Sequence, residues 1–167
     1  MKIIAKTLVE HDMATPLKNL RRSVKSLTGF DLRRMDSFTL VAMQATYLLL
    51  KDFTPKGSVG LYGVANYFSV ELLQSLIKSV EQKQDIRPFD FILSVGNAAN
   101  FYLAKQFEMN GPNIFLGSSS DPKKSIFELI GADASFNLID YAVFISWMEN
   151  ETRLECHAKL IRIKDAV

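Results

Sequence analysis

A run of three serines and an aspartate, Ser118-Ser119-Ser120-Asp121, is one candidate for a catalytic site, because a serine hydroxyl can act as a nucleophile. A serine hydroxyl becomes a nucleophile only beside a general base, and no histidine can be paired with this run from the sequence. The other interpretation is a polar turn that caps a helix beginning near Pro122. The sequence favours the cap, and it leaves Ser120 as the candidate nucleophile of a small acyltransferase or hydrolase.

Cys156 and His157 are a second pair of reactive side chains. Neighbouring residues on a strand point to opposite faces, so this pair cannot easily share a metal ion. We expect a core cysteine and a surface histidine, with no metal site and no cofactor. A single cysteine also excludes an intramolecular disulfide, which favours a reducing compartment.

Four basic residues, Lys18, Arg21, Arg22 and Lys25, fall on one face of a helix expected over residues 16–27. Such a face is usually solvated. It can also dock an acidic protein by charge complementarity. The net charge is only +2 and both signs are mixed along the chain, which does not favour a nucleic-acid binder.

The composition is that of one globular domain covering residues 1–167, with 48% hydrophobic and 23% charged residues. No window of about 18 apolar residues is present, and the N-terminus is too short and charged for a signal peptide. We therefore expect a soluble cytoplasmic protein.

Hydrophobic periodicity predicts an alternation of helices and short strands. The helices are expected over residues 16–27, 35–49, 70–80, 98–108 and 122–130, and the strands over 2–9, 58–64, 113–117, 138–148 and 153–163. Asp36 or Ser37 is expected to cap the second helix, and Gly131 to end the last one. This order predicts an α/β fold, a layered mixed sheet with helices packed on it, ending in an antiparallel hairpin.

Three collinear segments resemble the N-terminal half of β-ketoacyl synthases and their chain-length-factor relatives, in the thiolase-like superfamily. The first is Arg33-Arg34-Met35-Asp36-Ser37-Phe38-Thr39, followed by Ala42 and Ala45. The second begins at Gly96-Asn97-Ala98-Ala99-Asn100 and runs as a helix to Asn110-Gly111-Pro112-Asn113. The third runs from Gly111 to Ser120 and continues through a helix to Gly131-Ala132-Asp133.

The resemblance implies a thiolase-like half-fold without condensing activity. The nucleophilic cysteine of the family falls on Ser120, and a polar Asp-Pro-Lys sequence replaces the glycine-containing bend after it. The two histidines of the family lie in its C-terminal half, and neither His11 nor His157 matches them. We therefore expect a non-catalytic chain.

A truncated chain-length factor of type II polyketide or fatty-acid-like synthesis, for example of aryl polyenes, is the role that the resemblance implies. Such a chain completes the dimer of a full-length ketosynthase and shapes its acyl tunnel. The partner interface is expected on the strand Asn113, Ile114, Phe115, Leu116, Gly117, Ser118. The tunnel wall is expected at Phe89, Phe91, Phe101, Leu103, Phe107 and Met109, although phenylalanines at helical spacing are more often core. An acyl carrier protein would dock on the basic helix. A homodimeric acyl-binding scaffold is the alternative that uses the same strand.

Overall fold

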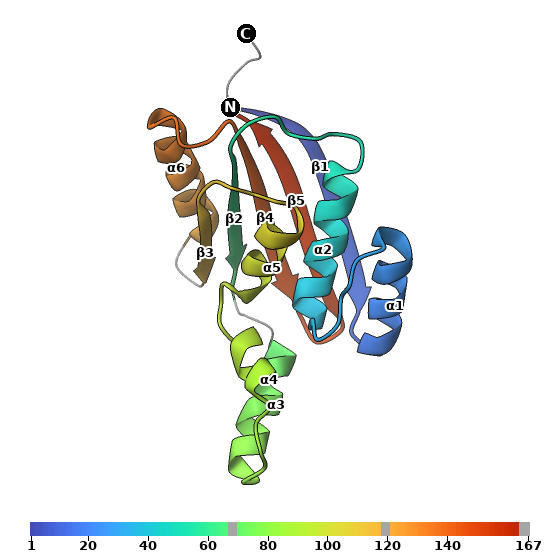
Figure 1. Cartoon of the computed structure of the whole chain (residues 1–167). Helices are drawn as coiled ribbons and strands as arrows, with labels where there is room; N and C mark the ends of the chain where they lie inside the picture. The colour runs from blue at the N-terminus through green and yellow to red at the C-terminus, as the bar shows by residue number, and fades with distance from the viewer. Residues whose placement is uncertain (67–69, 118–120, 164–167) are drawn as a thin grey trace.

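Figure 1 shows the computed structural model, which describes residues 1–66, 70–117 and 121–163. It contains a five-stranded sheet in the order β1-β5-β4-β2-β3. The strands are β1 (Lys2–Asp12), β2 (Val59–Ala65), β3 (Asn113–Gly117), β4 (Tyr141–Glu149) and β5 (Arg153–Arg162). β2 runs parallel to β3 and β4, whereas β5 runs antiparallel to β4 and β1, so the predicted mixed sheet is confirmed.

The strand β4 lies at the centre of the fold and is buried on both faces. Val143, Ile145 and Trp147 belong to the core on one side of the sheet, and Ala142 and Phe144 to the core on the other. This explains its continuous run of apolar residues. The predicted hairpin to β5 is confirmed by a continuous antiparallel register between the two strands.

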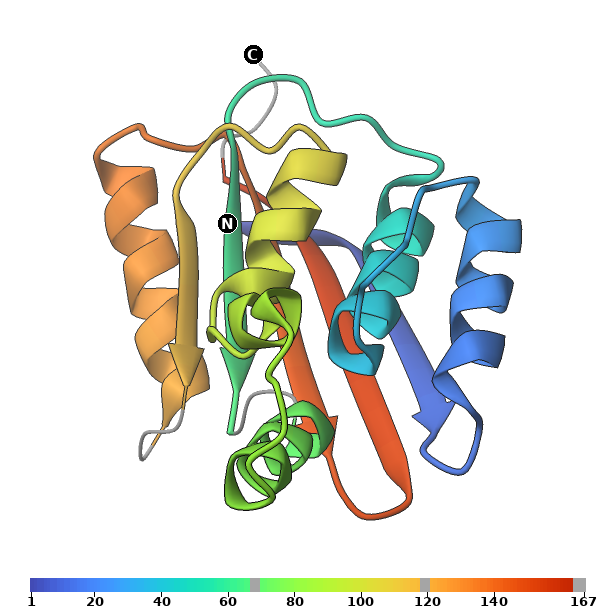
Figure 2. The same cartoon turned by 60° about the horizontal axis from the view of Figure 1, so that its bottom comes forward.

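Helices cover the two faces of the sheet unequally. The helices α1 (Leu17–Thr28), α2 (Ser37–Leu50) and α5 (Ala98–Gln106) lie on one side, and α6 (Pro122–Ser135) lies on the other (Figures 1 and 2). The remaining helices, α3 (Val70–Glu81) and α4 (Pro88–Leu93), project together beyond one end of the sheet (Figure 1). Among the described residues no helix is long and apolar enough to cross a membrane.

The helix α2 is the central element of the larger core. Its predicted cap is confirmed: the carboxylate of Asp36 accepts a hydrogen bond from the Thr39 amide at 2.9 Å. At the same end the indole of Trp147 stacks on Phe38, with ring centroids 4.4 Å apart, and donates to the Phe38 carbonyl at 3.0 Å. These contacts fix the start of α2 against the end of β4.

The prediction that Gly131 ends the last helix was wrong. α6 continues through Gly131 to Ser135. A glycine inside a helix costs only about 1 kcal/mol, which the packing of Ile126 and Ile130 against the sheet outweighs. The short helix α4 was not assigned from the sequence; it begins at Pro88, a residue suited to the first helical turn.

Candidate partner-binding surface

The strand β3 forms one edge of the sheet and pairs only with β2 among the described residues. Leu61 of β2 lies opposite Asn113 and donates its amide to the Pro112 carbonyl at 2.8 Å. In a parallel pair, a residue bonded in this way forms its backbone hydrogen bonds with the two residues that flank its partner, and not with the partner itself. The backbone N–H and C=O of Asn113 therefore point away from β2, toward the open side of the sheet.

The two edges of this sheet differ in charge. At the opposite edge, β1 carries Lys2, Lys6, Glu10, His11 and Asp12, and its register with β5 shifts between Ile3 and Ala5. Charged side chains and bulges are the usual protection of an edge strand against pairing with another chain. β3 reads Asn-Ile-Phe-Leu-Gly and has no charge, so it lacks this protection.

A network of polar contacts holds β3 in place. Asn100 on α5 is fully buried, and its side-chain amide donates to the Ile114 carbonyl at 3.0 Å. Gly63 on β2 leaves room for this side chain, because a Cβ there would lie 2.7 Å from the Asn100 Oδ1. The Asn110 carboxamide accepts from the Val59 amide at 3.1 Å, which anchors the turn before β3.

Gly111, in that turn, has a packing role. Its amide donates to the Val59 carbonyl at 2.9 Å, and a Cβ would lie only 2.8 Å from the same carbonyl oxygen. The Asn-Gly-Pro turn noted in the sequence therefore has a structural reason: it brings the backbone before β3 into direct contact with the start of β2.

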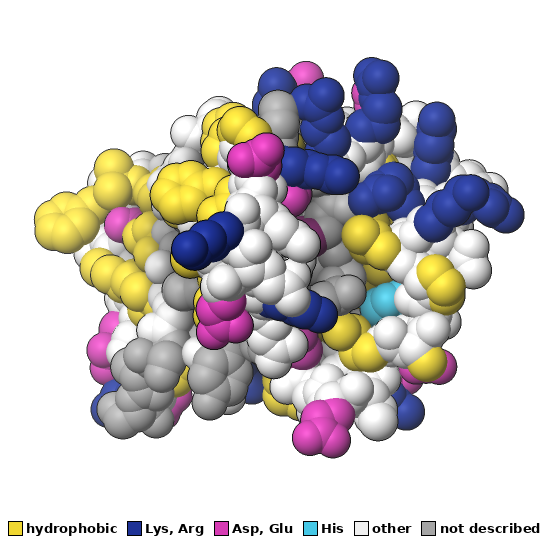
Figure 3. Space-filling model, turned by 90° about the horizontal axis from the view of Figure 1, so that it is seen from below, with side chains coloured by type: hydrophobic (Ala, Val, Ile, Leu, Met, Phe, Trp, Pro, Cys, Tyr) yellow, Lys and Arg dark blue, Asp and Glu magenta, His cyan; other side chains and the backbone are white. Residues whose placement is uncertain are grey.

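Exposed apolar side chains lie on α4, α5 and the segment between them. Phe91, Ile92, Val95 and Phe101 are each at least half exposed, with Phe91 at 64% and Phe101 at 57%. We call these four residues the α4–α5 patch. Figure 3 shows hydrophobic side chains gathered on this side of the molecule, apart from the basic side chains. Because α4 packs on α5, and α5 on β3, the patch belongs to the same side of the fold as the uncharged edge.

The six residues expected to form a tunnel wall fall into different environments. Leu103 is fully buried beneath α5, Met109 is 9% exposed, and Phe107 packs against the core with its ring 5.6 Å from that of Phe30. Phe91 and Phe101 are more than half exposed, whereas Phe107 is only partly exposed. The side chain of Phe89 lies outside what the structure describes.

The candidate nucleophile Ser120, and Ser118 at the end of the expected interface, lie outside the described residues. The next residue, Asp121, accepts a hydrogen bond from the Lys124 amide at 3.0 Å and so caps α6. This agrees with the expected helix cap. Asp133, at the other end of α6, also has a structural role. The Tyr62 hydroxyl donates a hydrogen bond to its carboxylate at 2.6 Å and so joins α6 to β2.

Burial and this hydrogen bond raise the pKa of Tyr62 above its usual range. Cys156 is fully buried in the core, and burial raises the pKa of its thiol as well. Such a thiol is a poor nucleophile. The neighbouring His157 lies on the other face of the sheet, 3.6 Å from the Glu155 carboxylate, as the strand pattern predicts. Among the described residues no group of three metal-binding side chains occurs.

The basic helix α1 presents most of its charges to solvent. Lys18, Arg22 and Lys25 are exposed, and Arg21 is partly buried with its guanidinium donating to the Met35 carbonyl at 2.7 Å. The helix contains no acidic residue. Within the described part of the chain, none of these four residues has a carboxylate within 4.0 Å. Figure 3 shows the resulting group of Lys and Arg side chains.

No protein-family model and no curated protein sequence matches this chain. Its backbone nevertheless resembles solved structures. A chain of the ketosynthase in complex with its chain length factor from Xenorhabdus doucetiae superposes with a TM-score of 0.70 and 13% identity, covering 96% of this chain and 78% of that one. The ishigamide ketosynthase/chain length factor gives a TM-score of 0.71 at 11% identity, covering 97% of this chain and 62% of that one.

A third structure, a type II polyketide synthase acyl-carrier protein in complex with its ketosynthase bound to the hexaketide, gives a TM-score of 0.58 at 13% identity. It covers 94% of this chain and 61% of that one. The fold is therefore the thiolase-like fold of ketosynthases and chain length factors, as the sequence motifs predicted. This chain spans less than two thirds of the matched chain in the second and third structures.

Proposed function

We propose that this chain is a non-catalytic, chain-length-factor-like partner of a ketosynthase in type II polyketide or fatty-acid-like synthesis. The observation that supports this most is the uncharged edge strand β3 on the same side of the fold as the α4–α5 patch. An unprotected edge recruits another strand through backbone hydrogen bonds, and an apolar patch beside it adds buried area.

A ketosynthase is the partner that we propose for this surface. The Xenorhabdus doucetiae and ishigamide structures are both assemblies of a ketosynthase with a chain length factor. A ketosynthase would itself present an edge strand of this fold, so that two such edges could join the sheets of both chains. Stable interfaces are apolar at their centre, which fits the four residues of the patch.

Phe91 and Phe101 are the residues that we propose for the wall of the partner's acyl tunnel. A wall of this kind needs apolar side chains that extend beyond their own chain, and both phenylalanines are more than half exposed. Leu103 and Met109 are committed to the core beneath α5 and influence the wall only by supporting that helix.

The proposed lack of catalysis follows from the residues available for it. Ser120 stands where the resemblance places the family's cysteine. Cys156, the single cysteine, is buried with a raised pKa. A chain that supplies only an interface and a wall needs no nucleophile.

Co-expression with a ketosynthase tests the proposal. We expect the two chains to co-purify as a 1:1 complex by size-exclusion chromatography with light scattering. The lone chain should be monomeric or aggregate, because its exposed apolar surface is uncovered. A stable homodimer that does not bind the co-expressed ketosynthase would overturn the proposal and favour the homodimeric scaffold.

We further propose that the basic face of α1 docks an acyl carrier protein, which is usually acidic. Replacing Lys18, Arg22 and Lys25 together by Glu should lower the association rate with the carrier about tenfold at low salt, because charge complementarity mainly governs encounter. Surface plasmon resonance at two ionic strengths measures this. The matched control replaces Lys123 and Lys124, exposed basic residues of α6, and an equal loss there would contradict a specific docking face.

A further inference from the structure

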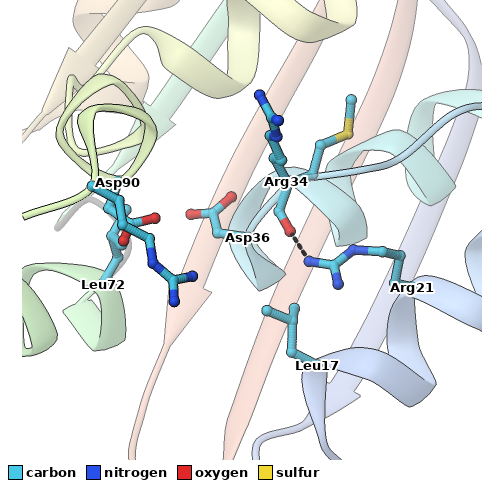
Figure 4. A pocket seen from close by; sticks show the side chains of 8 residues that line it. Leu17, Arg21, Arg34, Asp36, Leu72 and Asp90 are labelled. Carbon is cyan, nitrogen blue, oxygen red and sulfur yellow. Dashed lines mark hydrogen bonds between the residues drawn. The ribbon is translucent and has the colours of Figure 1, made fainter.

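A pocket of about 590 Å³ lies where the projecting helices α3 and α4 approach α1 and the start of α2. Figure 4 shows that its side chains come from all four elements. Three arginines line it: Arg21 from α1, Arg34 from the segment before α2, and Arg87 at the start of α4. Arginines more than 50 positions apart in the sequence thus line one cavity.

The charge of this pocket favours an anion. Among the described residues that line it, three arginines outnumber two aspartates, Asp36 and Asp90. The carboxylate of Asp36 is already engaged as the cap of α2. The exposed basic residues of α1 lie nearby and add to the positive potential.

Arg21 is positioned before any ligand arrives. One of its terminal nitrogens donates to the Met35 carbonyl at 2.7 Å, and its Nε is buried with no hydrogen-bond partner in the described structure. A buried donor without a partner is costly, and an oxyanion that reached it would remove that cost. A planar guanidinium held in this way matches the oxygens of a phosphate or carboxylate.

The pocket also has an apolar wall, formed by Leu17, Met35 and Leu72. We propose that it binds a phosphate monoester that carries an apolar chain. The arginines bind the phosphate dianion, because several guanidinium groups match a doubly charged anion better than a singly charged one. The apolar wall contacts the first carbons of the chain. This site does not use β3 or the α4–α5 patch, so the inference does not depend on the proposed function.

Hexyl phosphate and inorganic phosphate are the probes, titrated into the full chain by isothermal calorimetry. We expect hexyl phosphate to bind at least about tenfold more tightly, because burying even two methylenes accounts for that ratio. Heptanoate, with one negative charge, should bind more weakly than hexyl phosphate. Equal binding of heptanoate and hexyl phosphate, or no gain from the alkyl chain, would overturn the assignment.

Three variants locate the site. Arg87→Gln should weaken the binding of hexyl phosphate at least about fivefold, which corresponds to the interaction free energy of one pair of unit charges in water. Asp36→Asn retains a good helix cap but removes a negative charge, so it should strengthen binding by a similar factor. Arg22→Gln, on the same helix as Arg21 but outside the pocket, is the matched control; it removes only a distant positive charge, so it should weaken binding less than about twofold. A loss with Arg22→Gln equal to that with Arg87→Gln, or weaker binding by a folded Asp36→Asn chain, would reject this pocket as the site.

Discussion

The Asn113→Pro variant should fold normally and yet lose its ketosynthase partner. The Asn113 N–H points away from β2, so proline removes no hydrogen bond of the sheet itself. It does remove a donor from the open edge and adds a ring where a partner strand would approach. Leaving an interfacial acceptor unpaired costs about 2 kcal/mol, or roughly a 30-fold loss of affinity. Pull-down and light scattering of the co-expressed chains measure the loss.

Asn113→Ala is the control for the side chain. It removes the Asn113 carboxamide, whose contact to the Asn100 carbonyl is long at 3.5 Å, but it retains the backbone N–H. This variant should assemble as the unmodified chain does, and both variants should unfold in urea at similar midpoints. If Asn113→Pro assembles as well as Asn113→Ala, the edge strand is not the interface.

The course of the sheet was predictable because each strand carries a local signal. The apolar run over residues 138–148 indicated a strand buried on both faces, and the alternation that follows it indicated the hairpin partner; the strand itself begins later, at Tyr141. The capping role of Asp36 was predictable for the same reason, since a cap and its helix are adjacent in sequence.

The surfaces were less predictable, because they depend on the rotation of a helix about its axis and on contacts distant in sequence. Phe101 and Leu103 are two residues apart on α5, and one is exposed while the other is fully buried. Both are apolar residues of the same predicted helix, so the sequence does not show which of the two is exposed. The arginine pocket brings Arg21 and Arg87 together across 66 positions, and nothing in either local segment signals the other.

The largest expected effect on assembly comes from removing both exposed phenylalanines of the patch. Burying one phenylalanine side chain contributes about 1.5–3 kcal/mol, and aromatic residues dominate the energetics of interface centres. Phe91→Ser with Phe101→Ser should therefore weaken the complex at least about 100-fold. The lone chain should become more soluble, because less apolar surface is exposed. Analytical ultracentrifugation of the variant with and without the ketosynthase measures both effects.

Phe136→Ser is the matched control, since Phe136 is 74% exposed but follows the C-terminal end of α6, away from α4. It should leave the complex intact. The single Phe101→Ser variant then separates two roles of the patch: a wall residue changes the length of the product that the assembled pair makes, whereas a purely adhesive residue changes only the affinity. An unchanged complex in the double variant would place the partner elsewhere, and an unchanged product length in an assembled Phe101→Ser pair would remove Phe101 from the tunnel wall.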